Sequence, residues 1–306
     1  MKSKSILRTN VEYWAARLIL AVFSMLPLRF SLRLGSCLSR LFYSFAEKLQ
    51  RTGRRNLALA FPELSPPEHA RLLEGCFENL GRLLGVFSHF EKETPEAWRE
   101  IIDCEGLERL AALRAAGRAI ILFTGHVGAW ELTSFALSVF DEPLSFLVRR
   151  IDNPKIEALV DRYRTSRGNR TIDKMFAARE MLETLRHAGT LGILVDLNTL
   201  DREAVFVDFF GQKAATTFLV AKLALRTGAA VVPVFAPWDK ARGRVMLEIG
   251  EPVSIERTGD EEEDILRLTR SITNVVEDEV RRFPDQWLWV HRRWKTRPPG
   301  EPEIYG

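Results

Sequence analysis

The chain has 306 residues, with 44 Lys and Arg against 41 Asp and Glu and a hydrophobic content of 46%. This length allows one large domain or two small ones, and the apolar content is ample for a core. The three cysteines and five histidines show no metal-ligand spacing, which argues against a zinc site and favours reduced thiols in a cytosol-facing protein. Walker, GxGxxG and GxSxG loops are absent, which argues against nucleotide binding through such loops and against a serine-elbow hydrolase.

The net charge of +3 is unevenly distributed along the chain. Residues 1–60 hold 11 Lys and Arg against 2 Asp and Glu, and residues 281–297 hold 6 against 1. Both cationic segments are interleaved with large apolar side chains. This combination indicates an anionic membrane surface as a partner rather than nucleic acid, for which no basic module is visible.

Residues 13–28 are apolar except for Arg17 and Ser24. The uncharged part is shorter than the roughly 20 residues that cross a bilayer, and no clean signal-peptide cleavage site follows it. We expect a retained anchor lying in one leaflet, with Trp14 at the interface; the alternative is a buried N-terminal helix of an ordinary soluble protein. Residues 1–50 are therefore predicted as a membrane-anchoring helical segment and residues 51–306 as an α/β domain.

Helical patterns dominate up to about residue 100. An amphipathic helix is predicted over residues 30–49, and a short basic helix follows and ends at Pro62. Ser65 and Glu68 form a capping-box pattern that begins a helix reaching about Phe90. A further helix starts at Thr94. These helices are interpreted as scaffold.

From residue 118 onward, strand and helix patterns alternate. This alternation predicts an α/β fold with a mainly parallel or mixed sheet flanked by helices, in which ligand sites lie at the carboxyl ends of strands. Residues 239–244 are expected to form a hairpin loop. The predicted strands are 119–123, 144–148, 191–195, 230–235 and 245–249, and the predicted helices are 131–140, 154–163, 174–187, 217–226 and 262–282.

The first of these strands is followed at once by Gly125 and His126, and Glu131 falls in the first turn of the next helix. A turn between the two would let the side chains meet, so that the carboxylate fixes the tautomer of a general base. The alternative is a strand end and a helix-capping acid. Gly125 and Gly128 would allow close approach of backbone N–H groups to an oxyanion or phosphate.

Polar groups follow two further predicted strands. Arg149 and Arg150 come after the second strand, and Asp196 and Asn198 after the third. Because such ends share one edge of a parallel sheet, these groups are expected to gather near His126. The arginines could clamp a phosphate, or they could simply solvate a strand end.

The tail at residues 283–298 alternates tryptophans with basic residues. It could form an interfacial patch that meets lipid headgroups or an anionic carrier protein. It could equally be a strap that packs its tryptophans on the core.

Four stretches are similar to one known family: GHVGAWE (125–131), VRRIDNP (148–154), VFVDFFG with AATT and GAAVVP (205–233), and FPDQWLWVHRRWKTRP (283–298). Together with the apolar N-terminus, they resemble the late acyltransferases of lipid A biosynthesis, the lauroyl and myristoyl transferases within the lysophospholipid acyltransferase superfamily.

The resemblance implies an enzyme at the cytoplasmic face of a bacterial inner membrane. It would need no cofactor and would move a fatty acyl chain from acyl carrier protein, or from coenzyme A, to a hydroxyl of a lipid A-type glycolipid precursor. By this likeness His126 and Glu131 match the catalytic pair, Asp196 matches a family acidic position, and Asn198 departs from the more acidic loop of that branch. Functional basic residues of the family fall in the stretch that holds Arg149, Arg150 and Arg164. The alternatives are another lipid acceptor (a lysophospholipid, an amino lipid or a mannosylated lipid) and a non-catalytic lipid-binding protein.

Overall fold

A computed structural model describes residues 6–174 and 177–305. Each of the five predicted strands is present within about one residue of its expected bounds, as β2 (Ile120–Thr124), β3 (Ser145–Val148), β5 (Thr190–Leu194), β8 (Ala230–Phe235) and β10 (Arg244–Ile249). Five further strands were not predicted: β1 (Ile102–Glu105), β4 (Arg170–Asp173), β6 (Ala204–Phe209), β7 (Gln212–Thr217) and β9 (Trp238–Asp239).

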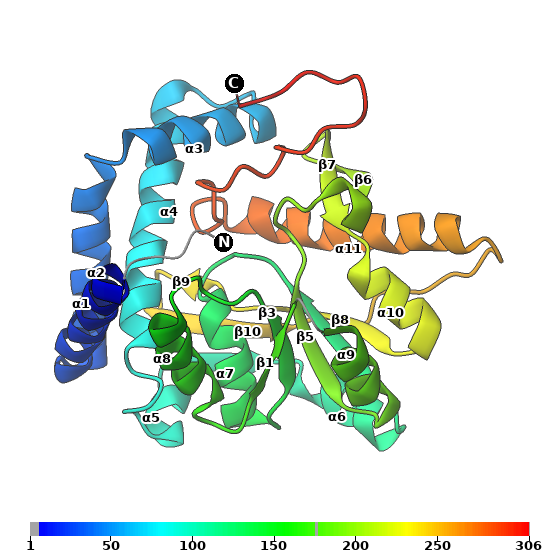
Figure 1. The fold of residues 1–306 in the computed structure, drawn as a ribbon, viewed down its shortest axis with the longest axis horizontal. Coiled ribbons are helices and arrows are strands. Elements are labelled where there is room, and N and C mark those ends of the chain that lie inside the picture. Colours follow the sequence, from blue (N-terminus) through cyan, green and yellow to red (C-terminus); the bar gives the residue numbers. More distant parts are fainter. Residues whose placement is uncertain (1–5, 175–176, 306) are drawn as a thin grey trace.

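The strands form one eight-stranded sheet and a separate hairpin (Figure 1). The sheet runs β1-β10-β8-β2-β5-β3-β4, with β9 added to β10, and only the pairs that join β10 to β8 and to β9 are antiparallel. The α/β fold with a mixed, mainly parallel sheet is thus confirmed, and so is the hairpin loop after β8. The β6–β7 hairpin stands outside the sheet.

Helices cover both faces of the sheet and extend beyond it (Figure 1). The predicted helix at 174–187 is observed as α9, and residues 175–176 lie outside the described residues. The helices are α1 (Ile6–Met25), α2 (Leu28–Tyr43), α3 (Glu47–Ala60), α4 (Pro66–Phe87), α5 (Pro95–Arg99), α6 (Leu107–Ala115), α7 (Trp130–Phe140), α8 (Pro154–Thr165), α9 (Ala177–Arg186), α10 (Leu219–Thr227) and α11 (Glu261–Arg282), with a 3₁₀ turn at Asp201–Glu203.

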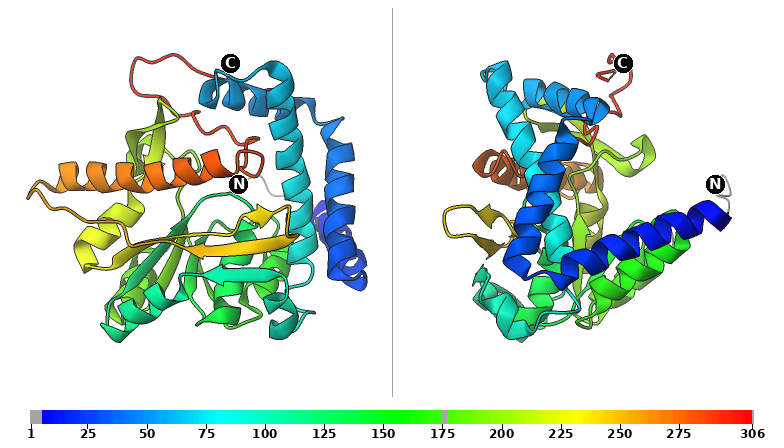
Figure 2. Two further views of the ribbon diagram at one scale, coloured as in Figure 1. Left: turned by 180° about the vertical axis from the view of Figure 1, so that it is seen from behind. Right: turned by 90° about the vertical axis from the view of Figure 1, so that its left-hand side faces the viewer.

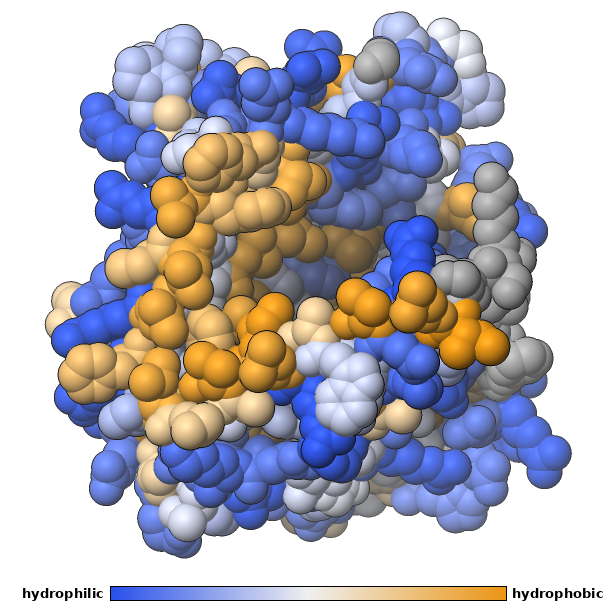
Figure 3. Space-filling model, turned by 60° about the vertical axis from the view of Figure 1, so that its left-hand side comes forward, coloured by the Kyte–Doolittle hydropathy of each residue, from blue (hydrophilic) through white to orange (hydrophobic). Residues whose placement is uncertain are grey.

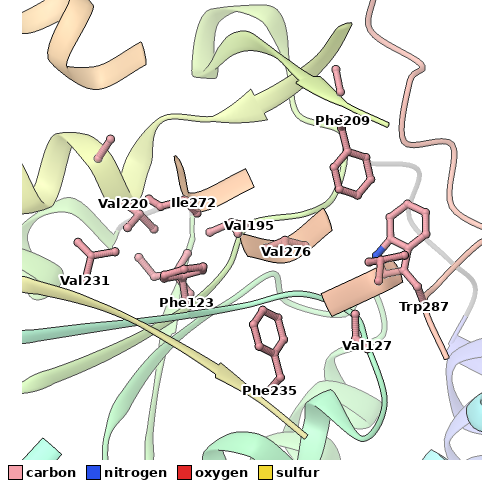
Figure 4. Packing of buried hydrophobic residues seen from close by; sticks show 14 of the residues in the cluster. Phe123, Val127, Val195, Phe209, Val220, Val231, Phe235, Ile272, Val276 and Trp287 are labelled. Carbon is pink, nitrogen blue, oxygen red and sulfur yellow. The ribbon is translucent and has the colours of Figure 1, made fainter. Parts of the chain in front are cut away.

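The central strand β2 is buried on both faces, and its side chains alternate between two cores. Ile121 and Phe123 join the core that α9, α10 and α11 cover, and Figure 4 shows this packing around Phe123 and Val276. Ile120 and Leu122 join the core that α7 and α8 cover. This sandwiching explains why β2 appears in the sequence as an uninterrupted apolar run.

The N-terminal helices form a wall beside the sheet. Helix α2 crosses α4 so closely that a Cβ atom added at Gly35 would lie 2.1 Å from the carbonyl oxygen of Gly81, and the reverse holds too. The predicted helix at 30–49 is interrupted at residues 44–46, and its second part belongs to α3, so a boundary at residue 50 falls inside a helix. The capping box at Ser65 and Glu68 is confirmed.

Helix α1 projects from this wall and lies beside α8 (Figure 2). Only Leu20 and Phe23 of α1 are buried, and Trp14 is 59% exposed. Helix α1 is therefore mostly exposed and not buried in the core, and its place in one leaflet of a membrane stays a prediction. Among the described residues, no helix combines the length and the apolar character needed to cross a bilayer.

Candidate active site

His126 lies just beyond β2 and is held by Asp196, which lies just beyond the neighbouring parallel strand β5. Register pairs Thr124 with Leu194 at the ends of the two strands, so both loops leave the same edge of the sheet. The Asp196 Oδ1 atom lies 2.7 Å from His126 Nδ1, and Asp196 Oδ2 accepts the backbone N–H of His126 at 2.7 Å. The predicted meeting of these two strand ends is confirmed.

Asp196 is buried and accepts three hydrogen bonds. Two come from His126, and the third comes from the indole Nε1 of Trp287 at 2.7 Å. Burial alone would raise the pKa of Asp196, but the charge of His126 and these hydrogen bonds lower it to about 2. Since an ionised carboxylate can only accept, Nδ1 of His126 carries a hydrogen, and in the neutral tautomer this leaves Nε2 as the acceptor.

Glu131 does not take the predicted place beside His126. Both oxygens of its carboxylate accept from Arg164 of α8, at 2.5 and 3.0 Å. The expected hydrogen bond from Glu131 to His126 is therefore corrected: Asp196 orients the imidazole, and Glu131 ties α7 to α8. Trp130, which lies between His126 and Glu131 in the sequence, packs on the His126 ring, and the two ring centroids are 5.1 Å apart.

The turn between His126 and α7 is pinned from two sides. The N–H of Gly128 donates to the Gln286 carbonyl at 3.1 Å, and the N–H of Ala129 donates to the Ala236 carbonyl at 2.7 Å. These N–H groups are thus engaged, which corrects the expectation that Gly128 offers one to an oxyanion. Gly128 has φ +60, and a Cβ there would lie 2.3 Å from the Ala236 oxygen, so its role is to permit the turn.

Gly125 has a different reason to lack a side chain. A Cβ at this position would lie 3.1 Å from Asp196 Oδ2 and 3.1 Å from a Val276 methyl group. The glycine lets the carboxylate approach the backbone of the β2 loop. Gly125 therefore supports the contact between Asp196 and His126.

The tail closes the site from one side. Trp287 forms an antiparallel bridge with Val127, and Figure 4 shows its ring between Val127 and Phe209. Trp287, Trp289 and Trp294 are all fully buried, so the interpretation of the tail as a packed strap is confirmed for these three tryptophans.

The same tail fixes the loop after β5. The backbone N–H of Asn198 donates to His291 Nε2 at 3.1 Å, and the Asn198 side chain bonds Thr296 through both its oxygen and its nitrogen. Burial lowers the pKa of His291 to about 4, so its ring is neutral and can accept this hydrogen bond. Asn198 was predicted among the substrate-binding residues, but its side chain and its N–H form hydrogen bonds with the tail and with Thr199.

The two strand-end arginines follow β3, next to β5 in the sheet. Arg149 is exposed, and within the described residues it has no ion pair. Arg150 is paired with Asp173 at 2.8 Å and extends toward Glu157. Within the described residues, the end of β3 thus carries one paired arginine, Arg150, and one arginine without an ion pair, Arg149.

The geometry provides a base with one open nitrogen. In the part of the chain that the structure describes, Nε2 of His126 has no hydrogen-bond partner, and Nδ1 is held by an anionic carboxylate. This arrangement can remove a proton from a hydroxyl and stabilise the resulting imidazolium. No group of three His, Cys, Asp or Glu side chains among the described residues could hold a metal ion.

Sequence reasoning missed Trp287 and His291 as parts of this site. A partial signal was present, because a buried indole N–H usually finds an acceptor. That the acceptor is Asp196, 91 residues away, depends on how the tail crosses the sheet edge.

Comparisons with known proteins identify the family of the chain. Residues 1–296 match the family described as bacterial lipid A biosynthesis acyltransferase. The lipid A biosynthesis lauroyltransferase of Escherichia coli (strain K12) is 30% identical over 301 residues, covering 96% of this chain and 95% of that protein. The myristoyltransferase and palmitoleoyltransferase of the same organism are 24% and 26% identical, covering 91% and 94% of their lengths. The chain belongs to the bacterial lipid A biosynthesis acyltransferase family.

Proposed function

We propose that this enzyme moves a fatty acyl group from acyl carrier protein, or from coenzyme A, to a hydroxyl of a lipid A-type glycolipid precursor. His126 is the general base, and Asp196 is the carboxylate that orients it. One observation carries the proposal: Asp196 holds Nδ1 of His126 at 2.7 Å and leaves Nε2 free. The likeness to the lauroyl and myristoyl transferases supports the substrate class.

The reaction needs no covalent acyl-enzyme. Nε2 of His126 takes the proton of the acceptor hydroxyl while the hydroxyl oxygen attacks the thioester carbonyl. The tetrahedral intermediate collapses, the carbon–sulfur bond breaks, and the imidazolium returns the proton to the leaving thiolate. Positioned acid–base catalysis of this kind contributes roughly 10²–10⁴-fold. Asp196 lowers the free energy of the imidazolium because it stays ionised at the working pH.

The basic residues around the site suit a phosphorylated acceptor. Arg149 is exposed at the end of β3, and Arg150 is 59% exposed at its side chain although it pairs with Asp173. Guanidinium groups bind phosphate oxygens in a fixed fork geometry. In this proposal the two arginines bind acceptor phosphate, whereas Arg164 serves to hold Glu131 and the start of α7.

An apolar face supports association with the inner membrane at its cytoplasmic side. Large hydrophobic side chains are exposed along α1 and α2, and Figure 3 shows them gathered on one face around a hollow. Apolar patches of this kind mark interaction surfaces. They include Ile6, Leu7, Val11, Trp14, Leu18, Ile19, Val22, Met25, Phe30, Leu38, Leu41 and Phe42.

The test compares His126→Ala with His187→Ala, a control at an exposed histidine that directly follows α9. We expect His126→Ala to bind membranes normally and to lose acyl transfer from acyl carrier protein, while His187→Ala keeps both. Mass spectrometry of lipids from cells with and without the gene identifies the acceptor, since the product gains one acyl mass. Near-normal turnover by His126→Ala would refute the proposed base. A mass gain on a lysophospholipid, amino lipid or mannosylated lipid alone would refute the proposed acceptor.

A further inference from the structure

A cavity lies between α3 and the C-terminal tail, apart from the His126 site. Its volume is about 920 Å³, and its walls come from Phe42, residues 44–49, Arg51, Thr52, Arg55, Arg292, Ile304 and Tyr305. None of the residues that hold or surround His126 lines it. The acyl-transfer chemistry therefore leaves this cavity without an assigned role.

Four cations line the cavity. Lys48, Arg51 and Arg55 stand at i, i+3 and i+7 on α3, which places them on one face of the helix. Arg292 faces them from the tail, with its guanidinium carbon 5.6 Å from the Tyr305 ring centroid. Glu47 is the one acidic side chain among the described lining residues.

These cations are not neutralised by the protein. Within residues 6–174 and 177–305, none of the four forms an ion pair, whereas Arg40 on the preceding helix pairs with Glu78. Like charges spaced one turn apart on a helix repel one another. An anion in the cavity would relieve this repulsion and accept hydrogen bonds from several guanidinium groups at once.

The walls of the cavity are fixed in place. Tyr305 Oη donates to Asn56 Oδ1 at 2.5 Å, and the buried Asn56 donates to the carbonyls of Trp289 and His291 at 2.6 Å. The tail wall is thereby tied to α3 before any ligand arrives. A preorganised wall lowers the entropy cost of binding.

The mouth of the cavity is apolar on the side of α2. Phe42 and Phe45 line the cavity and are 56% and 77% exposed. Leu38 and Leu41 continue this apolar surface along α2. Exposed cations along the cavity wall and a hydrophobic lip beside them match a molecule with an anionic head and a hydrocarbon chain.

We propose that this cavity binds the phosphate headgroup of an anionic membrane phospholipid, with an acyl chain of that lipid lying on Phe42 and Phe45. The continuity with the exposed face of α2 favours a membrane lipid over an acidic protein, which would not need the apolar lip. The proposal rests on the membrane association proposed above and is independent of the chemistry at His126. The bound lipid would fix how the enzyme is oriented on the bilayer.

The test uses the full chain and vesicles of phosphatidylcholine with or without phosphatidylglycerol. The double variant Arg51→Glu/Arg55→Glu reverses two cavity charges. The matched control, Arg179→Glu/Arg270→Glu, makes the same change at two exposed arginines on α9 and α11 that have no ion pair in the described part of the chain. Arg55→Gln is a milder variant, and thermal unfolding shows whether each one is folded.

The cavity variant is expected to lose at least about tenfold in partitioning to phosphatidylglycerol vesicles, since each Lys or Arg near such a surface contributes about 1 kcal/mol. Arg55→Gln should lose less in the same direction, and the control should stay within about twofold of the native chain. His126→Ala should bind as the native chain does, so this result stands even if the proposed base is wrong.

Three results would overturn the proposal. Equal losses in the cavity and control variants would show a general charge effect. Binding of inorganic phosphate by the native chain, with vesicle binding unchanged in the cavity variant, would show a site for free phosphate. Loss of affinity for acyl carrier protein, again with unchanged vesicle binding, would show a protein-docking surface.

Discussion

Replacing Trp287 by Phe tests whether the tail tunes Asp196, the carboxylate that holds the proposed base. The substitution keeps an aromatic ring but removes the indole N–H that donates to Asp196 Oδ2 at 2.7 Å. The two hydrogen bonds from His126 to Asp196 remain possible. Asp196 would then be a buried carboxylate with two donors in place of three, and its pKa would rise from about 2.

The expected fall in kcat follows from the charge of Asp196, which accepts the hydrogen bond. A hydrogen bond to a charged group contributes about 1.5–3 kcal/mol. If most of this is lost when the imidazolium forms, kcat falls by about tenfold to a hundredfold, since each 1.36 kcal/mol is a factor of ten. The ring is also smaller, so the free energy of unfolding will fall for reasons unrelated to Asp196.

Trp289→Phe is the matched control. Trp287 and Trp289 are both fully buried, and their rings touch with centroids 4.6 Å apart. The Nε1 of Trp289, however, donates to the neutral carbonyl of Pro284. Both variants should lose similar stability, and only Trp287→Phe should lose kcat well beyond what its stability loss explains.

The assay is acyl transfer from acyl carrier protein at saturating acceptor, measured beside thermal unfolding of each variant. A larger fall in kcat than in substrate affinity is expected, because the indole acts on Asp196 and not on the substrate. Equal activity losses in the two tryptophan variants would refute the reasoning, and so would a Trp287→Phe variant with native kcat.

Three further predictions concern the surroundings of the base. Glu131 is expected to act through its ion pair with Arg164, so Glu131→Gln and Arg164→Met should each lower activity. The double variant should lose less activity than the sum of the two single losses, which corresponds to a coupling free energy of about 0.5–3 kcal/mol. Simple additivity of the two losses would contradict this role. Gly128→Ala should lower the melting temperature far more than Gly211→Ala. Both glycines have positive φ, but only at Gly128 would the new Cβ lie 2.3 Å from a carbonyl oxygen. Equal losses would show that φ alone matters. The pKa of His291 falls from 6.5 to about 4 on folding. The neutral ring therefore contributes fully to stability above pH 6.5, and this contribution, about 3 kcal/mol in total, is lost as the pH falls toward 4. His291→Gln should flatten the dependence of melting temperature on pH between these values, and an unchanged dependence would exclude His291 as its source.

The parts of the fold that sequence could predict are those in which pattern and burial coincide. Strand β2 is apolar at Ile120–Phe123 because it is covered on both faces. Strand β4 was missed because Ile172 is its one buried residue, so its sequence resembles a loop. The β6–β7 hairpin turns at Phe210 and Gly211, which have φ 53 and 69, and it was missed because Phe is an unusual residue at the first of these two positions.

The site was predictable in its location but not in its pairing. His126 and Asp196 follow strands that are neighbours in the sheet, so the order of strand ends was enough to bring them together. Glu131 is closer in sequence, and a turn does separate it from His126 as expected. The backbone bonds of Gly128 to the tail and of Ala129 to Ala236 set the direction of that turn, and they send Glu131 toward Arg164. Such long-range bonds leave no periodic signal in the sequence.

The strap formed by the tail has a consequence for the order of synthesis. The exposed apolar helices α1 and α2 are made first, and the base and its carboxylate are made by residue 196. The third hydrogen-bond donor to Asp196 is Trp287, which is made much later. The carbonyl partners of Asn56 lie 233 and 235 residues further along the chain. With the membrane association and the base proposed above, a nascent chain would meet the bilayer through α1 and α2 long before the tail completes the site around Asp196.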